Sequence, residues 1–214
     1  MRRFLVLAPL TLLIAVIAYE GYAVTRAHAR TPEVLALPRP LTLDRVSPDR
    51  QAALLTVDDP NFYGHHGLDF ATPGQGNTNL TQSLVKRFYF KRFQPGFQKI
   101  EQMLIARYVV TPAISKRDQL ELFYNYAYFG SLRGREVIGF PAAARAYFGR
   151  EFAALDERQY LALVAMLIAP NALDPLRHPR ENAERVQRIQ ALLEARCRPA
   201  DRGDIWYAGC AVNR

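Results

Sequence analysis

Residues 58–67 read Asp58-Asp59-Pro60-Asn61-Phe62-Tyr63-Gly64-His65-His66-Gly67. Two adjacent carboxylates stand close to histidines and aromatic rings, a combination typical of acid–base catalysis. The same residues also suit a turn in which the aspartates cap a helix and the histidines satisfy buried backbone groups. The segment alone does not decide between a catalytic cluster and a structural turn.

A second polar segment, residues 75–86, reads Gln-Gly-Asn-Thr-Asn-Leu-Thr-Gln-Ser-Leu-Val-Lys and leads from a loop into an amphipathic helix. Free backbone N–H groups at a helix start, together with hydroxyls and Lys86, suit the binding of a phosphate. The alternative is an ordinary capped helix with a solvated lysine. On its own, this segment favours the alternative.

Apolar residues from residue 51 onward recur mainly at helical spacing. The run 160–168 is apolar almost all round, which predicts a buried helix, and a last amphipathic helix is predicted from Pro179. No stretch alternates with a period of two, so the predicted fold class is mainly α. Two apolar stripes are expected to face inward, and they consist of Leu80, Leu84, Val85 and Phe88, and of Ile100, Met103, Leu104 and Tyr108. Two capping boxes are predicted, at Ser115 with Asp118 and at Asp156 with Gln159.

The composition indicates a globular protein with anionic partners. The chain has 214 residues, 50% of them hydrophobic, and a formal net charge of +8. Such a charge favours phosphates, anionic lipid head groups or nucleic acid, and by itself does not choose among them.

The N-terminal residues predict export. Arg2 and Arg3 precede an uncharged run from Phe4 to Tyr19, which is marginal but adequate for a membrane anchor with a cytoplasmic N-terminus. A cleaved signal peptide is the alternative, since residues 27–29 read Ala-His-Ala, but this site lies far beyond the apolar run. Either interpretation exports the domain and argues against nucleic acid. The expected organisation is an anchor (1–24), a proline-containing linker or stalk (25–50), a globular domain (51–196) and a C-terminal tail (197–214).

Two cysteines, Cys197 and Cys210, lie in this tail. In an oxidising compartment they could form a disulfide that contributes roughly 3 kcal/mol. The alternative is two unpaired small apolar residues. The export signal favours the disulfide, and the lack of a nearby histidine or third cysteine argues against a metal site there.

Taken in order, these segments resemble glycosyltransferase family 51, the peptidoglycan glycosyltransferases. The family's first motif, Glu-Asp-x-x-Phe-x-x-His-x-Gly, falls on Asp58, Asp59, Phe62, His65 and Gly67. Its second, Gly-Gly-Ser-Thr-Ile-Thr-Gln-Gln-Leu-x-Lys-Asn, corresponds to residues 76–87, with matches at Gly76, Thr81, Gln82, Leu84 and Lys86. Its third, Arg-Lys-x-x-Glu-x-x-x-Ala, falls on Gln98, Lys99, Gln102 and Ala106. Residues 116–130 and 139–149 resemble two later stretches, so the resemblance spans roughly residues 50 to 175.

The resemblance implies a mainly α, lysozyme-like, two-lobed glycosyltransferase domain behind a single transmembrane helix, on the outer side of the inner (cytoplasmic) membrane. It implies polymerisation of lipid II into glycan strands, in which a carboxylate deprotonates the acceptor hydroxyl and basic residues stabilise the departing diphosphate. No cofactor follows from it except a divalent metal, which often assists near the second carboxylate. The implied partners are lipid II, the growing glycan chain, the membrane and other cell-wall synthesis proteins, and not nucleic acid.

Carried over by position, the resemblance makes Asp58, Asp59 and Gln102 the catalytic residues. The implied substrate-binding residues are Phe62, His65, Gly76, Thr78, Thr81, Gln82, Lys86, Arg87 and Lys99.

Several positions depart from the family pattern. Asp58 replaces the general-base glutamate and is one methylene shorter, and a displacement near 1 Å can cost on the order of a hundredfold in rate. Gln102 replaces a glutamate, and an amide supplies no negative charge to a metal or to Lys99. Gln98 replaces an arginine, which removes one diphosphate contact. The stretch from Asp69 to Gly76 is shorter than is usual, so a helix is expected to be missing.

Residues 87–93, Arg-Phe-Tyr-Phe-Lys-Arg-Phe, interleave cations with aromatic rings. Single-strand nucleic-acid binding is one interpretation. Behind an export signal, contact with the membrane interface is favoured instead. An amphipathic helix end with solvated cations is equally compatible.

Three functions are compatible with these residues. The first is an active polymerising glycosyltransferase, and the second is a lipid II-binding or scaffold protein of the same fold, motivated by Gln98 and Gln102. The third is a glycan-cleaving enzyme, which the order of the motifs supports little. A cleft that brings Asp58 together with Lys86 and Lys99 would favour the first.

Overall fold

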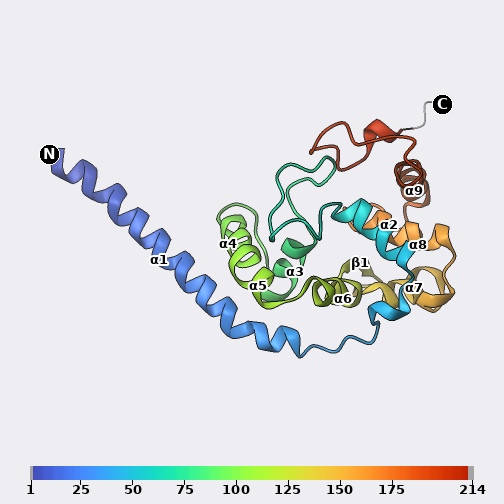
Figure 1. The fold of residues 1–214 in the computed structure, drawn as a ribbon, viewed down its shortest axis with the longest axis horizontal. Coiled ribbons are helices and arrows are strands. Elements are labelled where there is room, and N and C mark those ends of the chain that lie inside the picture. Colours follow the sequence, from blue (N-terminus) through green and yellow to red (C-terminus); the bar gives the residue numbers. More distant parts are fainter. Residues whose placement is uncertain (1, 212–214) are drawn as a thin grey trace.

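A computed structural model describes the backbone of residues 2–211 and the side chains of residues 11–211. The fold is mainly helical, which confirms the predicted class (Figure 1). In chain order the elements are α1 (Arg2–Leu35), η1 (Leu43–Arg45), α2 (Pro48–Asp58), α3 (Leu80–Tyr89), α4 (Phe97–Ile105), the π-helical turn η2 (Ala106–Val110), α5 (Thr111–Ala113), α6 (Lys116–Tyr126), β1 (Tyr128–Leu132), β2 (Arg135–Ile138), α7 (Phe140–Phe148), η3 (Phe152–Ala154), α8 (Glu157–Met166), α9 (Pro179–Leu193) and η4 (Ala208–Cys210).

Helix α1 extends away from the rest of the molecule, and its C-terminal half packs against α4 and η2 (Figure 1). Ala27 and Val34 are buried, and the hydroxyl of Thr31 lies 2.9 Å from that of Tyr89 at the end of α3, which α1 also contacts. Residues 25–35 of the expected linker are therefore helical, because they have a surface to pack against. Among the described residues, no helix is both long and apolar enough to cross a membrane. The side chains of residues 4–10, where the expected anchor begins, lie outside the described part of the structure.

Helix α8 forms the centre of the core, as its uniformly apolar sequence predicts. Its residues from Tyr160 to Met166 are buried against α2, α7 and α9. Asp156 and Gln159 form the predicted capping box at its start. At the start of α6 only half of the predicted capping box forms: the Ser115 side chain accepts a hydrogen bond from the Asp118 backbone N–H, and the Asp118 carboxylate accepts one from the Ser115 hydroxyl. These caps satisfy N–H groups that a helix start leaves without partners.

Two sequence-based expectations were wrong. Strands β1 and β2 form an antiparallel hairpin, although no strand was predicted. A register shift between Tyr128 and Ser131 interrupts the regular pairing, so the short strands show no clean alternation. The second error is the apolar stripe on α4, because Ile100 is 48% exposed and Tyr108 is 57% exposed. Helices α1 and α3 pack on another face of α4, where Glu101, Gln102 and Ile105 are buried.

The C-terminal tail folds back onto the loop between α2 and α3 (Figure 1). This loop, residues 59–79, consists of turns and contains no helix, as expected from its short length. The N–H groups of Gly74 and Gly76 donate to the carbonyls of Asp201 and Arg202, both at 2.9 Å. The predicted disulfide between Cys197 and Cys210 is confirmed, and it closes the tail into a loop.

Removing this cross-link should destabilise the protein. The disulfide joins residues 13 apart in sequence, so its loss in Cys197→Ala/Cys210→Ala should lower the free energy of unfolding by about 3 kcal/mol. Urea denaturation under oxidising conditions measures this difference. With a reducing agent present, wild type and variant should become equal. Equal stability under oxidising conditions would contradict the expected contribution of the cross-link.

Candidate active site

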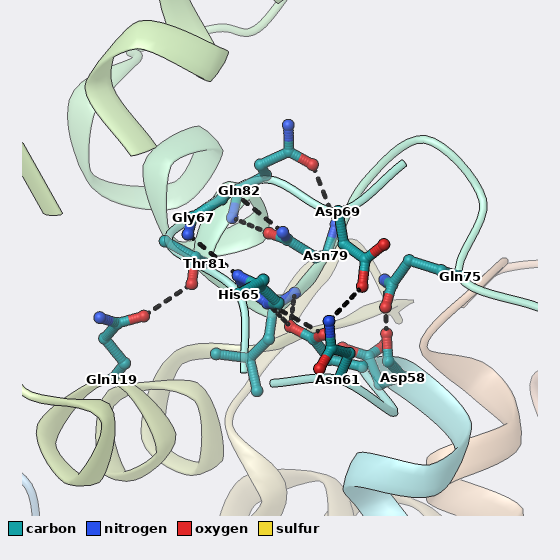
Figure 2. Close-up of polar contacts among 12 residues, drawn as sticks. Asp58, Asn61, His65, Gly67, Asp69, Gln75, Asn79, Thr81, Gln82 and Gln119 are labelled. Atoms are coloured by element: carbon teal, nitrogen blue, oxygen red, sulfur yellow. Dashed lines mark hydrogen bonds and ion pairs between the residues drawn. The ribbon is translucent and has the colours of Figure 1, made fainter. Parts of the chain in front are cut away.

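Asp59 is fully buried and is held by contacts from two directions. The Nδ1 atom of His65 accepts a hydrogen bond from the Gly67 N–H at 2.9 Å, so the ring proton lies on Nε2. Nε2 donates to the Asp59 carboxylate, with its oxygens at 3.0 and 3.1 Å (Figure 2). The Leu80 N–H, at the start of α3, donates to the same carboxylate at 3.1 Å. Asp59 therefore ties the end of α2 to the start of α3.

Gly67 is required at its position for steric reasons. Its φ angle is +88°, and an added Cβ would lie only 2.5 Å from the carbonyl oxygen of Ala106. The Gly67 carbonyl also accepts a hydrogen bond from the Asn79 side chain at 3.0 Å. Asn79 forms a capping box with Gln82 at the start of α3. The two polar segments singled out in the sequence are thus joined to one another.

Lys116 is a nearby cation that the sequence analysis did not single out. Its Nζ atom lies 4.2 Å from the centre of the Phe62 ring and is buried, and no residue in the described part of the chain forms a hydrogen bond with it. Burial lowers the pKa of the Lys116 ammonium to about 8, although the charge of Asp59 acts in the opposite direction. The signal in the sequence was its place at the start of a matched stretch, directly after the cap Ser115.

Asp58 lines two cavities of about 450 Å³ and 460 Å³. The two cavities share Asp58, Ser83 and Lys86, so they form one cleft in two parts. Within the described part of the chain, the Asp58 carboxylate makes no hydrogen bond, although its backbone carbonyl accepts one from Gln75 (Figure 2). Burial and the adjacent Asp59 raise the pKa of the Asp58 carboxyl to about 7, against the effect of Lys86 and Arg185. A base with such a pKa exchanges protons readily near neutral pH.

The predicted cationic residues lie along the cleft or at its loop. Lys86 lines both parts of the cleft, and Arg87 lines the first part. Lys99 donates from Nζ to the Asn77 carbonyl at 2.6 Å and to the Thr78 hydroxyl at 3.2 Å. Burial and the charge of Lys86 lower the pKa of the Lys99 ammonium to about 8. The cleft therefore gathers Asp58 with most of the predicted cations.

The loop residues Gly76 and Thr78 line the second part of the cleft, as expected of substrate-binding residues. Gly76 has a φ angle of +67°, and an added Cβ would lie 2.6 Å from a methyl carbon of Ile205. The loop therefore has no room for a side chain at this point.

The remaining predicted residues lie behind the cleft and not on its walls. Phe62 and His65 are buried beside Asp59. Gln82 caps α3, and Thr81 donates to the Gln119 side chain at 2.7 Å (Figure 2). Gln102 is fully buried and donates to the Gln82 carbonyl at 2.7 Å, so the structure does not bring it to Asp58. These residues support the loop and α3 and do not face the cleft.

The residues behind Asp58 do not fit a divalent metal. Both oxygens of Asp59 accept hydrogen bonds from His65, and one also accepts from Leu80. Gln102 is a neutral amide, and the adjacent Glu101 contacts Arg26 and Tyr19 of α1 instead. Within residues 11–211, no three His, Cys, Asp or Glu side chains are grouped as ligands. The implied metal therefore finds no set of ligands here.

Sequence reasoning missed the outer wall of the second part of the cleft. This wall contains Arg185 of α9 and residues 202, 203 and 205 of the C-terminal tail. Arg185 could have been noticed, because it follows Asn182 by three positions and precedes Ile189 by four on the inward face of α9. The tail residues carry no such pattern.

Loss of the His65 side chain should leave the Asp59 charge buried without its main partner. We expect His65→Ala to lower the free energy of unfolding by about 3 kcal/mol at neutral pH, measured by urea denaturation. His66→Ala is the matched control, since the neighbouring ring is exposed, and it should change stability by about 0.5 kcal/mol or less. Adding Asp59→Asn to His65→Ala should recover part of the loss. Equal effects of the two histidine variants would contradict this role of His65.

The chain is similar to a known protein family and to several known proteins. A family model described as Transglycosylase matches residues 36–194, about three quarters of the 214 residues. Penicillin-binding protein 1F of Bacillus subtilis is 28% identical over 167 residues, covering 72% of this chain and 23% of that protein. Penicillin-binding protein 1B of Escherichia coli is 30% identical over 154 residues, covering 66% of this chain and 18% of that protein.

A predicted transglycosylase of Cupriavidus necator is 27% identical over 191 residues, covering 80% of each chain. The chain thus spans less than a quarter of these two penicillin-binding proteins but most of the Cupriavidus protein. Because the family match covers about three quarters of the chain and includes the Asp58 loop, α3 and all of α9, the chain belongs to the transglycosylase family, the peptidoglycan glycosyltransferases.

Proposed function

We propose that the protein polymerises lipid II into glycan strands, with Asp58 as the general base. The observation that carries this proposal is an Asp58 carboxylate that lines the cleft beside Lys86 and makes no hydrogen bond to any residue that the structure describes. Its pKa of about 7 keeps a large part of it deprotonated at neutral pH while leaving it basic enough to accept a proton. Membership of the transglycosylase family supports this class of reaction.

In the proposed step, Asp58 takes the proton from a hydroxyl of the acceptor sugar. The hydroxyl oxygen attacks the anomeric carbon of the lipid-linked donor, and the bond from this carbon to the diphosphate breaks with its electron pair on the phosphate oxygen. Lys86 and Arg87 stabilise the charge that develops there, since both line the cleft. Lys99 holds the loop at Asn77 and supplies a further positive charge next to it.

The cleft also supports a two-lobed, lysozyme-like arrangement. Its second part is lined on one side by residues of α2, α8 and α9, which pack on one another, and on the other by residues of α3, which packs on α4 and α6 (Figure 1). We assign α3 to α6 to one lobe and α2 with α7 to α9 to the other. A cleft between two helical lobes can hold an extended sugar chain with the base at its middle.

We further propose that the domain lies outside the cytoplasmic membrane, with residues 1–24 as a single-pass anchor and residues 51–196 as the catalytic domain. The Cys197–Cys210 disulfide supports this location, because such cross-links persist in oxidising compartments. Arg2 and Arg3 suit the cytoplasmic end of an anchor. Lipid II, the glycan chain and the membrane are then the partners, along with other cell-wall synthesis proteins.

A second candidate is a lipid II-binding or scaffold protein without turnover. It is favoured by Gln102, whose amide stands where the family has a carboxylate and is buried away from Asp58. The shorter side chain of Asp58 would also matter, since a misplacement near 1 Å can reduce the rate about a hundredfold.

Polymerisation of labelled lipid II by the full-length protein separates the two functions. Wild type should extend glycan chains, and Asp58→Asn should reduce the rate by at least about a hundredfold because the base is lost. Asp49→Asn is the matched control on the same helix, since Asp49 is exposed at the other end of α2, and it should retain activity. Lipid II binding without chain growth in wild type would contradict the enzyme and support the scaffold.

A further inference from the structure

The C-terminal tail lines the second part of the cleft, although it lies beyond the residues that the family model matches. The match ends at residue 194, whereas Arg202, Gly203 and Ile205 line this cavity. The tail is fixed there by its disulfide, by the backbone pairing with Gly74 and Gly76, and by the Tyr207 hydroxyl, which donates to the Val57 carbonyl. These contacts fix the tail in place as one side of the cleft.

Arg185 is a buried cation with an unused donor in this wall. The residue is only 5% exposed, and its Nη1 atom donates to the Ile205 carbonyl at 2.9 Å. Its guanidinium lies over the Tyr207 ring, 5.0 Å from the ring centre. The Nε atom is buried and has no hydrogen-bond partner among the described residues. A buried guanidinium whose donors are not all satisfied is costly, and Arg185 lines the cavity, so an anionic ligand bound there would stabilise its charge.

Positive charge exceeds negative charge on the walls of this cavity. Arg185, Arg202 and Lys86 line it, and Asp58 is the acidic residue among its described lining residues. The Arg202 side chain makes no hydrogen bond or ion pair within the described residues, while its backbone carbonyl accepts from Gly76. Burial lowers the pKa of the Arg185 guanidinium to about 10, which leaves it charged at neutral pH. The cavity therefore has an excess of positive charge that a ligand can neutralise.

We propose that the disulfide-closed tail builds an anion subsite beside Asp58, in which Arg185 and Arg202 bind the diphosphate of a lipid-linked sugar. This inference rests on the proposed function for the identity of the ligand. Guanidinium groups present several N–H donors in a fixed plane, which matches phosphate oxygens. A diphosphate carries more than one negative charge. It therefore matches two arginines and a lysine better than a ligand with a single carboxylate would.

The test measures binding of inorganic pyrophosphate to the full-length protein by isothermal titration calorimetry at fixed salt. Arg202→Gln should weaken binding about tenfold, as expected for the loss of a charge-assisted hydrogen bond. Arg198→Gln is the matched control, because it removes the same charge from an exposed position in the same tail, and it should change the affinity less than about twofold. Arg185→Gln should weaken binding at least as much, with its melting temperature recorded because the residue is buried.

Equal affinity in the Arg202 and Arg198 variants, or no binding of pyrophosphate by wild type, would overturn the subsite. Binding of D-alanyl-D-alanine that depends on Arg202, in place of pyrophosphate, would overturn the diphosphate as ligand and assign a peptide carboxylate. The polymerisation assay separates the two proposals. Chain growth with no effect of Arg202 on pyrophosphate binding removes only this inference, whereas Arg202-dependent binding without chain growth removes only the enzymatic function.

Discussion

The buried contact between Asp59 and His65 is the constraint on which the arrangement of the cleft depends. A fully buried carboxylate must be satisfied by donors, and the ring of His65 and the backbone N–H of Leu80 supply them. The ring is oriented in turn by Gly67, which no residue with a side chain could replace at that approach to Ala106. The Asp59 carboxylate thereby holds α2, the loop and α3 together. The adjacent carboxylate, that of Asp58, is left to face the cleft.

The protonation behaviour of the cleft depends on these different positions of Asp58 and Asp59. Asp58 lies beside a second carboxylate and in a partly desolvated position, and both effects disfavour its ionised form. Lys86 and Arg185 act against them, and burial in turn lowers the pKa of each of these cations. The tail beyond the family match contributes here, since it buries Arg185 and adds Arg202 to the wall. A segment without any of the family's motifs thus shapes the electrostatics around Asp58.

Local patterns in the sequence predicted what depends on nearby residues. The capping box of α8, the capping role of Ser115, the buried helix α8 and the disulfide were predicted correctly. The structure also brings Gly76, Thr78 and Lys86 to the cleft that Asp58 lines. The predictions failed where tertiary packing decides which side of a helix is buried. The stripe at Ile100 and Tyr108 faces outward because α1 and α3 pack on another face of α4, and Gln102 lies behind α3 for the same reason. Arg202 reaches the cleft only because the tail folds back over residues separated from it by more than a hundred positions.

Titration of the Asp58 carboxyl carbon by ¹³C NMR, assigned through its loss in Asp58→Asn, is the most direct measurement. Asp69 offers an internal reference with a low pKa. Burial acts to raise the pKa of Asp69, but hydrogen bonds from Thr72, Ala71 and Asn61 hold it well below the usual range. Burial and Asp59 raise the pKa of Asp58, so its proton should be lost only as the pH rises through about 7. That midpoint would establish a desolvated base facing the cleft. A midpoint near the ordinary aspartate value of about 3.9 would mean a solvated or paired carboxylate and would contradict its role as the base.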